Sequence, residues 1–177
     1  MAELSGQGPI VHSGATSVVD SSASGVKLGT RGVDVDGNEW VYVDFQQALA
    51  IGEWVAFDHT YAASRITNTS RGFVGVVGAT VSASDRFGWV QVRGVNTFAW
   101  ASSGATTADP IVIAATTDLG SIGTGTSADT SVAVFNAKVC TAPDTCASTA
   151  LSTSALAAPC TVILMYPFIT GAFAVSS

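Results

Sequence analysis

Two histidines, His12 and His59, are the side chains of this 177-residue sequence whose ordinary pKa suits acid–base catalysis near neutral pH. A hydrolytic triad also needs a nucleophile beside its base, and α/β-hydrolases carry that nucleophile in a G-x-S-x-G motif, which the sequence lacks. His12 lies in a stretch of small residues, and His59 follows Asp58 in a predicted turn. We therefore expect neither histidine to be catalytic and the protein not to be an enzyme.

Asp34, Asp36 and Asn38 stand at the first three ligand spacings of a calcium-binding loop. The pattern then fails, because Glu39 occupies the sixth position, which should be glycine, and Phe45 occupies the twelfth, which should be glutamate. A glycine follows Asp36, and the Asp-Gly dipeptide is typical of a tight turn between antiparallel strands. The sequence therefore predicts a β-hairpin here and no metal site.

Two further motifs match chemistry only in part. The glycine-rich segment 120–125 has the composition of a phosphate-binding loop but lacks the Lys-Ser/Thr pair that contacts phosphate and Mg²⁺. Asn68 begins an N-glycosylation pattern, which we interpret as incidental because the sequence shows no secretory signal. We expect no cofactor.

The three cysteines, Cys140, Cys146 and Cys160, are an odd number, and their spacing does not match a zinc site. Thiols in a reducing cytosol are the favoured interpretation, and a disulfide between Cys140 and Cys146 across a turn is the alternative.

The large aromatic and basic side chains have two possible roles each. Exposed tryptophans could stack on sugar rings, but packing in the core is favoured because a fold rich in small residues needs some large side chains inside. Four arginines in a short central stretch could bind a ligand, but pairing with acidic groups, locally or across an interface, is favoured because acidic residues outnumber basic ones. The tryptophans are Trp40, Trp54, Trp89 and Trp100, and the four arginines of the central stretch are Arg65, Arg71, Arg86 and Arg93.

The composition argues against two classes of partner. Only 11% of residues are charged and the formal net charge is −6, so the basic surface that binds nucleic acid is missing. The longest apolar stretch, from Cys160 to Val175, is shorter than the roughly 20 residues of a membrane-spanning helix and is interrupted by Pro167 and Gly171. Hydrophobic residues still make up 47% of the chain, which suggests that part of the surface is covered in an assembly.

Short β-rich segments separated by glycine-bearing turns predict an all-β protein. The expected architecture is a single compact β-barrel or sandwich-like domain over residues 26–177, preceded by an extended arm over residues 1–25. Alternation within 87–94 places Val90 and Val92 on one side and the polar Gln91 and Arg93 on the other. The main expected strands are 40–45, 53–57, 73–81, 87–94 and 161–166, the last ended by Pro167, with one helical turn at 46–51 and a flexible loop at 118–127.

Three segments carry a resemblance to a known family: Gly72–Ala79, Phe87–Gly94 and the step Tyr166-Pro167-Phe168. In these segments the sequence resembles the small auxiliary head proteins of tailed bacteriophages. The resemblance implies a β-rich decoration (cement) protein, often trimeric, that binds the outside of the major capsid lattice and stabilises the head. It also implies a location on the virion surface after synthesis in the host cytoplasm.

The arm is expected to contact the capsid by strand addition, with its apolar residues filling pockets. An unstructured terminus is the alternative. The alternative function for the whole chain is a glycan-binding β module associated with a tail or fibre, which would use exposed tryptophans. The arm residues expected to anchor on the capsid are Leu4, Ile10, Val11, Val18 and Val19.

Overall fold

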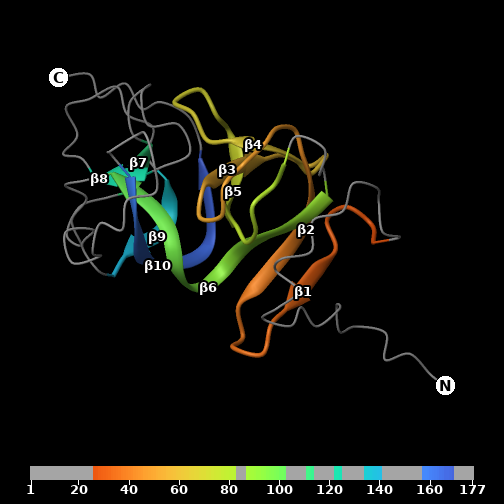
Figure 1. Ribbon diagram of the computed structural model, residues 1–177, viewed down its shortest axis with the longest axis horizontal. Coiled ribbons are helices and arrows are strands. Elements are labelled where there is room, and N and C mark those ends of the chain that lie inside the picture. The colour runs from red at the N-terminus through yellow and green to blue at the C-terminus, as the bar shows by residue number, and fades with distance from the viewer. Residues whose placement is uncertain are drawn as a thin grey trace.

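The computed structural model describes residues 26–82, 87–102, 111–113, 122–124, 134–140 and 157–169. Regular structure in these residues consists of strands alone, so the all-β prediction is confirmed (Figure 1). Within the same residues, no helix is long and apolar enough to cross a membrane. The strands are β1 (Arg31–Val33), β2 (Glu39–Phe45), β3 (Trp54–Phe57), β4 (Ala62–Arg65), β5 (Gly72–Val77), β6 (Phe87–Ser102), β7 (Ile111–Ile113), β8 (Ile122–Thr124), β9 (Phe135–Val139) and β10 (Ala157–Ile169).

The strands pair in a closed ring. Its order is β2–β4–β3–β5–β10–β6, and β6 pairs back onto β2. β2 and β4 run parallel, and the other ring pairs are antiparallel. The β1–β2 hairpin lies beside the first half of the long strand β6, and β7 and β8 lie near the C-terminal end of β6 (Figure 1). β6 therefore links two parts of the sheet.

Strands β3 and β5 are walls shared by two apolar cores. Val55 and Phe57 of β3 pack inside the ring, in the cluster that holds Val90 of β6. The alternate residues of β3, Trp54 and Ala56, pack in the other core. Because both faces of β3 are covered, its sequence is a continuous apolar run rather than an alternation.

Strand β6 follows the predicted alternation, but both of its faces are covered. Val90 and Val92 lie in the core of the ring, as predicted. On the other face, Trp89 packs with neighbouring aromatic rings and is only 8% exposed, and Gln91 is 1% exposed. The Gln91 amide donates to the Val95 carbonyl at 3.2 Å and accepts from Asn96 at 2.8 Å. These hydrogen bonds allow the polar side chain of Gln91 to be buried on the face opposite Val90 and Val92.

The expectation that Pro167 ends the last strand is wrong. β10 continues to Ile169, and its partner changes at this point: Met165 lies opposite Arg93 of β6, and Phe168 lies opposite Phe73 of β5. The register against β9 also shifts between Leu164 and Phe168. A proline has no N–H to donate, so it is tolerated where the ladder is already interrupted.

Two other local expectations are also wrong. The predicted helical turn at 46–51 is a bend and a turn around one isolated bridge, Leu49↔Val81. The predicted loop at 118–127 contains strand β8, which pairs with β7. Burial of Ile122 in a core stabilises this short segment in the sheet. Residues 1–25, the predicted arm, lie outside the described residues.

Candidate functional site

The β1–β2 turn is organised by one carboxylate. Asp34 accepts hydrogen bonds from the backbone N–H groups of Asp36 and Asn38, from the Asn38 amide and from the Trp40 indole, at 2.9–3.0 Å. Burial alone would raise the pKa of Asp34, but the bonds from Asn38, Trp40 and Asp36 outweigh it, so the pKa lies below its ordinary value. The predicted hairpin is confirmed, and the Asp34 carboxylate stabilises its turn.

The hairpin is fastened to β6 through Asn38. Its side-chain oxygen accepts the Val95 N–H at 3.0 Å. The neighbouring Gly94 has a φ of 101°, and a Cβ there would lie 2.1 Å from the same Asn38 oxygen. The glycine of the Phe87–Gly94 segment thus permits the close approach that fixes β1 and β2 against β6.

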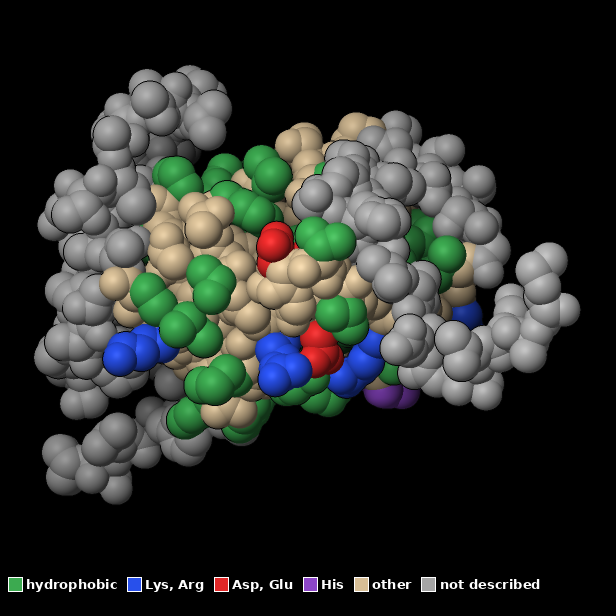
Figure 2. All heavy atoms as spheres, turned by 90° about the horizontal axis from the view of Figure 1, so that it is seen from below, with side chains coloured by type: hydrophobic (Ala, Val, Ile, Leu, Met, Phe, Trp, Pro, Cys, Tyr) green, Lys and Arg blue, Asp and Glu red, His purple; other side chains and the backbone are tan. Residues whose placement is uncertain are grey.

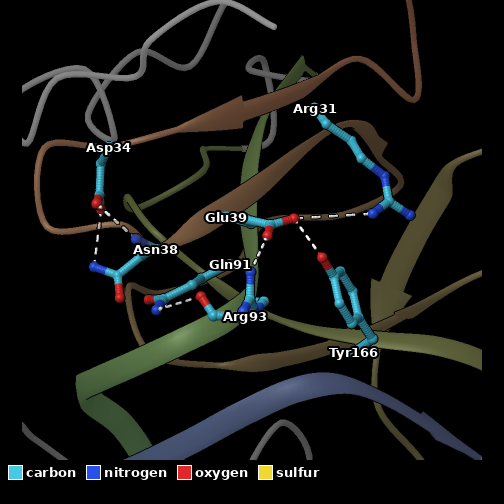
Figure 3. Close-up of polar contacts among 7 residues, drawn as sticks. All are labelled: Arg31, Asp34, Asn38, Glu39, Gln91, Arg93 and Tyr166. Carbon is cyan, nitrogen blue, oxygen red and sulfur yellow. Dashed lines mark hydrogen bonds and ion pairs between the residues drawn. The ribbon is translucent and has the colours of Figure 1, made fainter. Parts of the chain in front are cut away.

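Glu39 is the centre of a polar network that joins four strands (Figure 3). One of its oxygens accepts from Arg93 of β6 at 2.5 Å, and the other accepts from the Tyr166 hydroxyl of β10 at 2.5 Å. Arg31 of β1 lies 4.0 Å from the second oxygen, and its guanidinium also stacks 5.2 Å from the centre of the Tyr166 ring. The network brings together residues that are 127 positions apart.

The network changes the proton affinity of its members. The hydrogen bond from Tyr166, then the bond and charge of Arg93 and the charge of Arg31, lower the pKa of Glu39 despite its burial. The same hydrogen bond to Glu39, together with burial, raises the pKa of Tyr166. Both shifts keep Glu39 ionised and Tyr166 protonated at neutral pH, which suits a fixed structural contact rather than proton transfer.

Tyr166 reaches Glu39 from an uncommon backbone conformation. Its φ is 55°, in the left-handed region that bulky residues rarely adopt. This conformation falls where β10 changes partner from β6 to β5. Irregularities of this kind in a strand redirect a side chain, and here they aim the tyrosine at the network.

Exposed apolar side chains surround the charged network. The register places Val33 opposite Glu39, Glu39 opposite Arg93, and Arg93 opposite Met165, in a row across β1, β2, β6 and β10. Met165 is 54% exposed, and the next cross-strand pair, Val95 and Ile163, is exposed as well. Figure 2 shows a face on which an acidic side chain lies between basic ones, with hydrophobic side chains beside them. We call Val33, Glu39, Arg93, Val95, Ile163 and Met165 the sheet-face patch.

Trp40, Trp54 and Trp89 are buried, which confirms core packing for these three. A buried ring has no free face for a sugar, so the glycan-binding alternative would depend on Trp100, which is half-buried. The Trp54 indole donates to the Trp100 carbonyl at 3.0 Å. These three tryptophans therefore build the cores rather than a platform for stacking sugars.

The predicted arginine pairs are found in part. Arg65 donates hydrogen bonds from two nitrogens to the buried Glu53 carboxylate, at 3.0–3.1 Å, and Arg93 pairs with Glu39. Burial raises the pKa of Glu53, although Arg65 opposes that effect. Arg71 instead donates to the Ser70 carbonyl, and Arg86 lies outside the described residues.

The other predicted positions are placed as follows. His59 is exposed, and His12 lies outside the described residues, as do the arm residues Leu4, Ile10, Val11, Val18 and Val19. Cys140 is an exposed free cysteine, Cys160 is buried, and Cys146 lies outside the described part. In the part of the chain that the structure describes, no group of three or more His, Cys, Asp or Glu residues is arranged to hold a metal ion.

The sequence analysis missed Arg31, Glu39 and Tyr166 as members of one site. Their sequence separations carry no motif, and each residue alone resembles an ordinary surface side chain. The available signal was the position of Glu39 at the start of a strand made mostly of apolar residues. A carboxylate in such a strand is expected to pair with side chains of neighbouring strands.

Replacing Glu39 with glutamine is expected to lower the free energy of unfolding by about 1 kcal/mol at neutral pH, near the upper end for a partly exposed ion pair. The pKa of Glu39 is lowered by folding, so its contribution is present above the ordinary value of 4.5 and is lost as the pH falls through the lowered pKa. Urea unfolding of both proteins across that range should show the difference shrinking in acid. Asp36→Asn, which removes a charge from the exposed turn of the same hairpin, is the control. A difference that stays constant with pH would contradict the role of Glu39.

Comparison of the chain with family models, with curated proteins and with solved structures gives no match.

Proposed function

We propose that this protein is a structural virion protein, a decoration or cement protein that binds the outside of the major capsid lattice of a tailed bacteriophage and stabilises the head. The sheet-face patch is the observation that carries the proposal. It combines exposed apolar side chains with a central ion pair, the composition expected of a surface that binds another protein.

The three segments that resemble phage head proteins are neighbours in the sheet. β5 contains most of the first segment, β6 contains the second, and β10 contains Tyr166-Pro167-Phe168. β5 pairs with both β6 and β10, and β10 pairs with β6. Segments far apart in the sequence thus form one continuous part of the fold, which supports treating the resemblance as one structural unit.

The patch suits docking without rearrangement. Its side chains project from hydrogen-bonded strands, so little backbone freedom is lost on binding. Apolar residues such as Met165 and Val95 would be covered by the partner, and the Glu39–Arg93 pair would favour one orientation over others. The proposal needs no catalytic group. The carboxylates of Asp34, Glu39 and Glu53 each accept hydrogen bonds within the fold, which suits a structural role.

The proposal includes a homotrimer. Low charge and a large apolar fraction favour covering surface between copies, and closed symmetry is the usual form of soluble assemblies. The trimer and the major capsid protein are the proposed partners, on the capsid surface. Light scattering at micromolar concentration measures the mass of the free protein.

Removing the apolar character of the patch should weaken capsid binding. We expect Val95→Glu, opposite the uncharged Ile163, to reduce the affinity for undecorated heads at least about tenfold, since burying an unpaired charge costs well over the roughly 1.4 kcal/mol that this factor represents. The heads are those made from the genome that encodes the chain, and cosedimentation measures occupancy. Ile51→Glu places the same charge on an exposed apolar residue away from the patch and should bind normally. Equal binding by both variants would argue against docking through the patch.

The arm is tested in the same assay. A chain lacking residues 2–25 should keep its melting temperature, because a segment of small residues with scattered apolar anchors adds little to a folded core. Its occupancy on heads should fall sharply if the arm adds a strand to the capsid protein. Full occupancy by the truncated chain would remove the arm from the proposal.

A further inference from the structure

A pocket of about 460 Å³ opens where the strands of the ring converge. Every ring strand except β4 contributes to its wall, and Tyr61, the residue before β4, completes it. The volume falls in the range of pockets that bind small organic molecules. The lining residues are Arg31, Val41, Phe57, Tyr61, Phe73, Val74, Val92, Tyr166 and Pro167.

The wall of the pocket is apolar and aromatic. Val41, Phe57 and Val92 belong to the core of the ring, so the floor continues into packed hydrophobic side chains. Phe73 lies with its ring centre 5.9 Å from that of Phe57 and is 54% exposed at the rim. A flat apolar body would be surrounded by carbon on several sides here.

Of the described residues that line the wall, Arg31 is the one with a cationic side chain. Among the described residues its guanidinium makes the 4.0 Å ion pair with Glu39 and the stacking contact with Tyr166, and 4.0 Å is too long for a hydrogen bond. Both oxygens of Glu39 are already occupied by shorter bonds, to Arg93 and to Tyr166. The N–H donors of Arg31 therefore remain available to an anion, and their fork matches a carboxylate.

Both tyrosines of the wall have left-handed backbone conformations. The φ angles are 61° for Tyr61 and 55° for Tyr166. Such conformations cost about 1–3 kcal/mol each and cluster at active sites, ligand clamps and switch regions. A Cβ on Gly29 would lie 2.3 Å from the Tyr61 ring, so the glycine makes room for that ring at the pocket. The surrounding fold thus holds both rings in place at this wall.

From the pocket, its apolar wall and the unused donors of Arg31, we infer that the protein binds a small organic monocarboxylate with a flat apolar body. The apolar body lies against Phe57, Phe73 and Val92. The carboxylate meets the guanidinium of Arg31, which lies beside Tyr166 (Figure 3). This binding does not require a capsid, and it is measured on the isolated protein.

Titration calorimetry with naphthoate and with its uncharged amide, naphthamide, tests the inference. We expect saturable binding of one naphthoate per chain, at least about tenfold tighter than naphthamide, as for one charge-assisted hydrogen bond. Salt should weaken naphthoate binding and leave naphthamide unchanged. Absence of saturable naphthoate binding, or equal affinity for the two compounds, would overturn the inference.

Variants locate the site. Arg31→Gln should abolish the preference for naphthoate, while Lys138→Gln, which removes a positive charge from β9 outside the pocket, should preserve it. Phe73→Ala should weaken both compounds, and because Phe73 is half exposed the variant should remain folded. A preference that survives Arg31→Gln, or affinities that Phe73→Ala leaves unchanged, would place the binding elsewhere and overturn the assignment.

Discussion

Trp89→Ala is expected to lower the free energy of unfolding by about 3–5 kcal/mol, the range for removal of a large buried aromatic side chain. Trp89 packs edge-on against Tyr42, with ring centres 5.2 Å apart, and shares a cluster with Trp40. Val26 and Leu28 also pack against this cluster. Loss of the ring would leave a cavity among these side chains, because the paired strands β2 and β6 cannot move together to fill it.

Unfolding in urea, followed by far-ultraviolet circular dichroism, measures this loss independently of tryptophan fluorescence. Trp89→Phe should lose less, because a smaller ring still fills part of the space. Phe73→Ala provides a matched control, since it removes an aromatic ring that is half exposed. A loss of only a few tenths of a kcal/mol for Trp89→Ala would mean that its ring is accessible, and the glycan-binding alternative would then regain its main residue.

Gly52→Ala is the second large effect, and we expect a loss of about 2–5 kcal/mol from two costs. The φ of Gly52 is 88°, which costs an L-residue roughly 1–2 kcal/mol. An added Cβ would also lie 2.1 Å from the Phe98 carbonyl oxygen, a backbone atom that cannot rotate away, and such overpacking costs about 1–3 kcal/mol.

The strands on both sides hold Gly52 in this position. Its N–H donates to the Val77 carbonyl at 3.0 Å, and its own carbonyl accepts from Trp100 at 2.9 Å. Gly37→Ala is a matched control, because Gly37 has a similar φ of 80° and no atom within 4 Å of the added Cβ. The difference between the two variants in urea unfolding isolates the steric cost. Equal losses would show that the Phe98 backbone moves aside.

The sequence by itself determined the features that depend on neighbouring residues. The Asp-Gly dipeptide after Val35 marks the hairpin turn, because the turn conformation depends on the residues within it. Runs of β-branched and aromatic residues likewise mark β2, β3, β5 and β6, since these side chains pack well against cross-strand neighbours on a pleated sheet.

Some strands had no local signal of this kind. β4, with the sequence Ala-Ala-Ser-Arg, carries no hydrophobic alternation, and it is a strand because β2 and β3 provide its backbone partners. β8 belongs to the sheet through the burial of Ile122. β10 passes through Pro167 because the change of partner from β6 to β5 leaves a place where no N–H is needed.

The tertiary structure alone decided which faces are covered and which side chains meet. Gln91 is buried because Asn96 and backbone carbonyls satisfy its amide, a condition that alternation along one strand cannot reveal. Glu39, Arg93 and Tyr166 form one network only after the ring closes, and the pocket beside Arg31 exists only where its strands converge. Local conformation follows from short-range sterics and hydrogen bonding, whereas such sites depend on the register between strands distant in sequence, which no local pattern encodes.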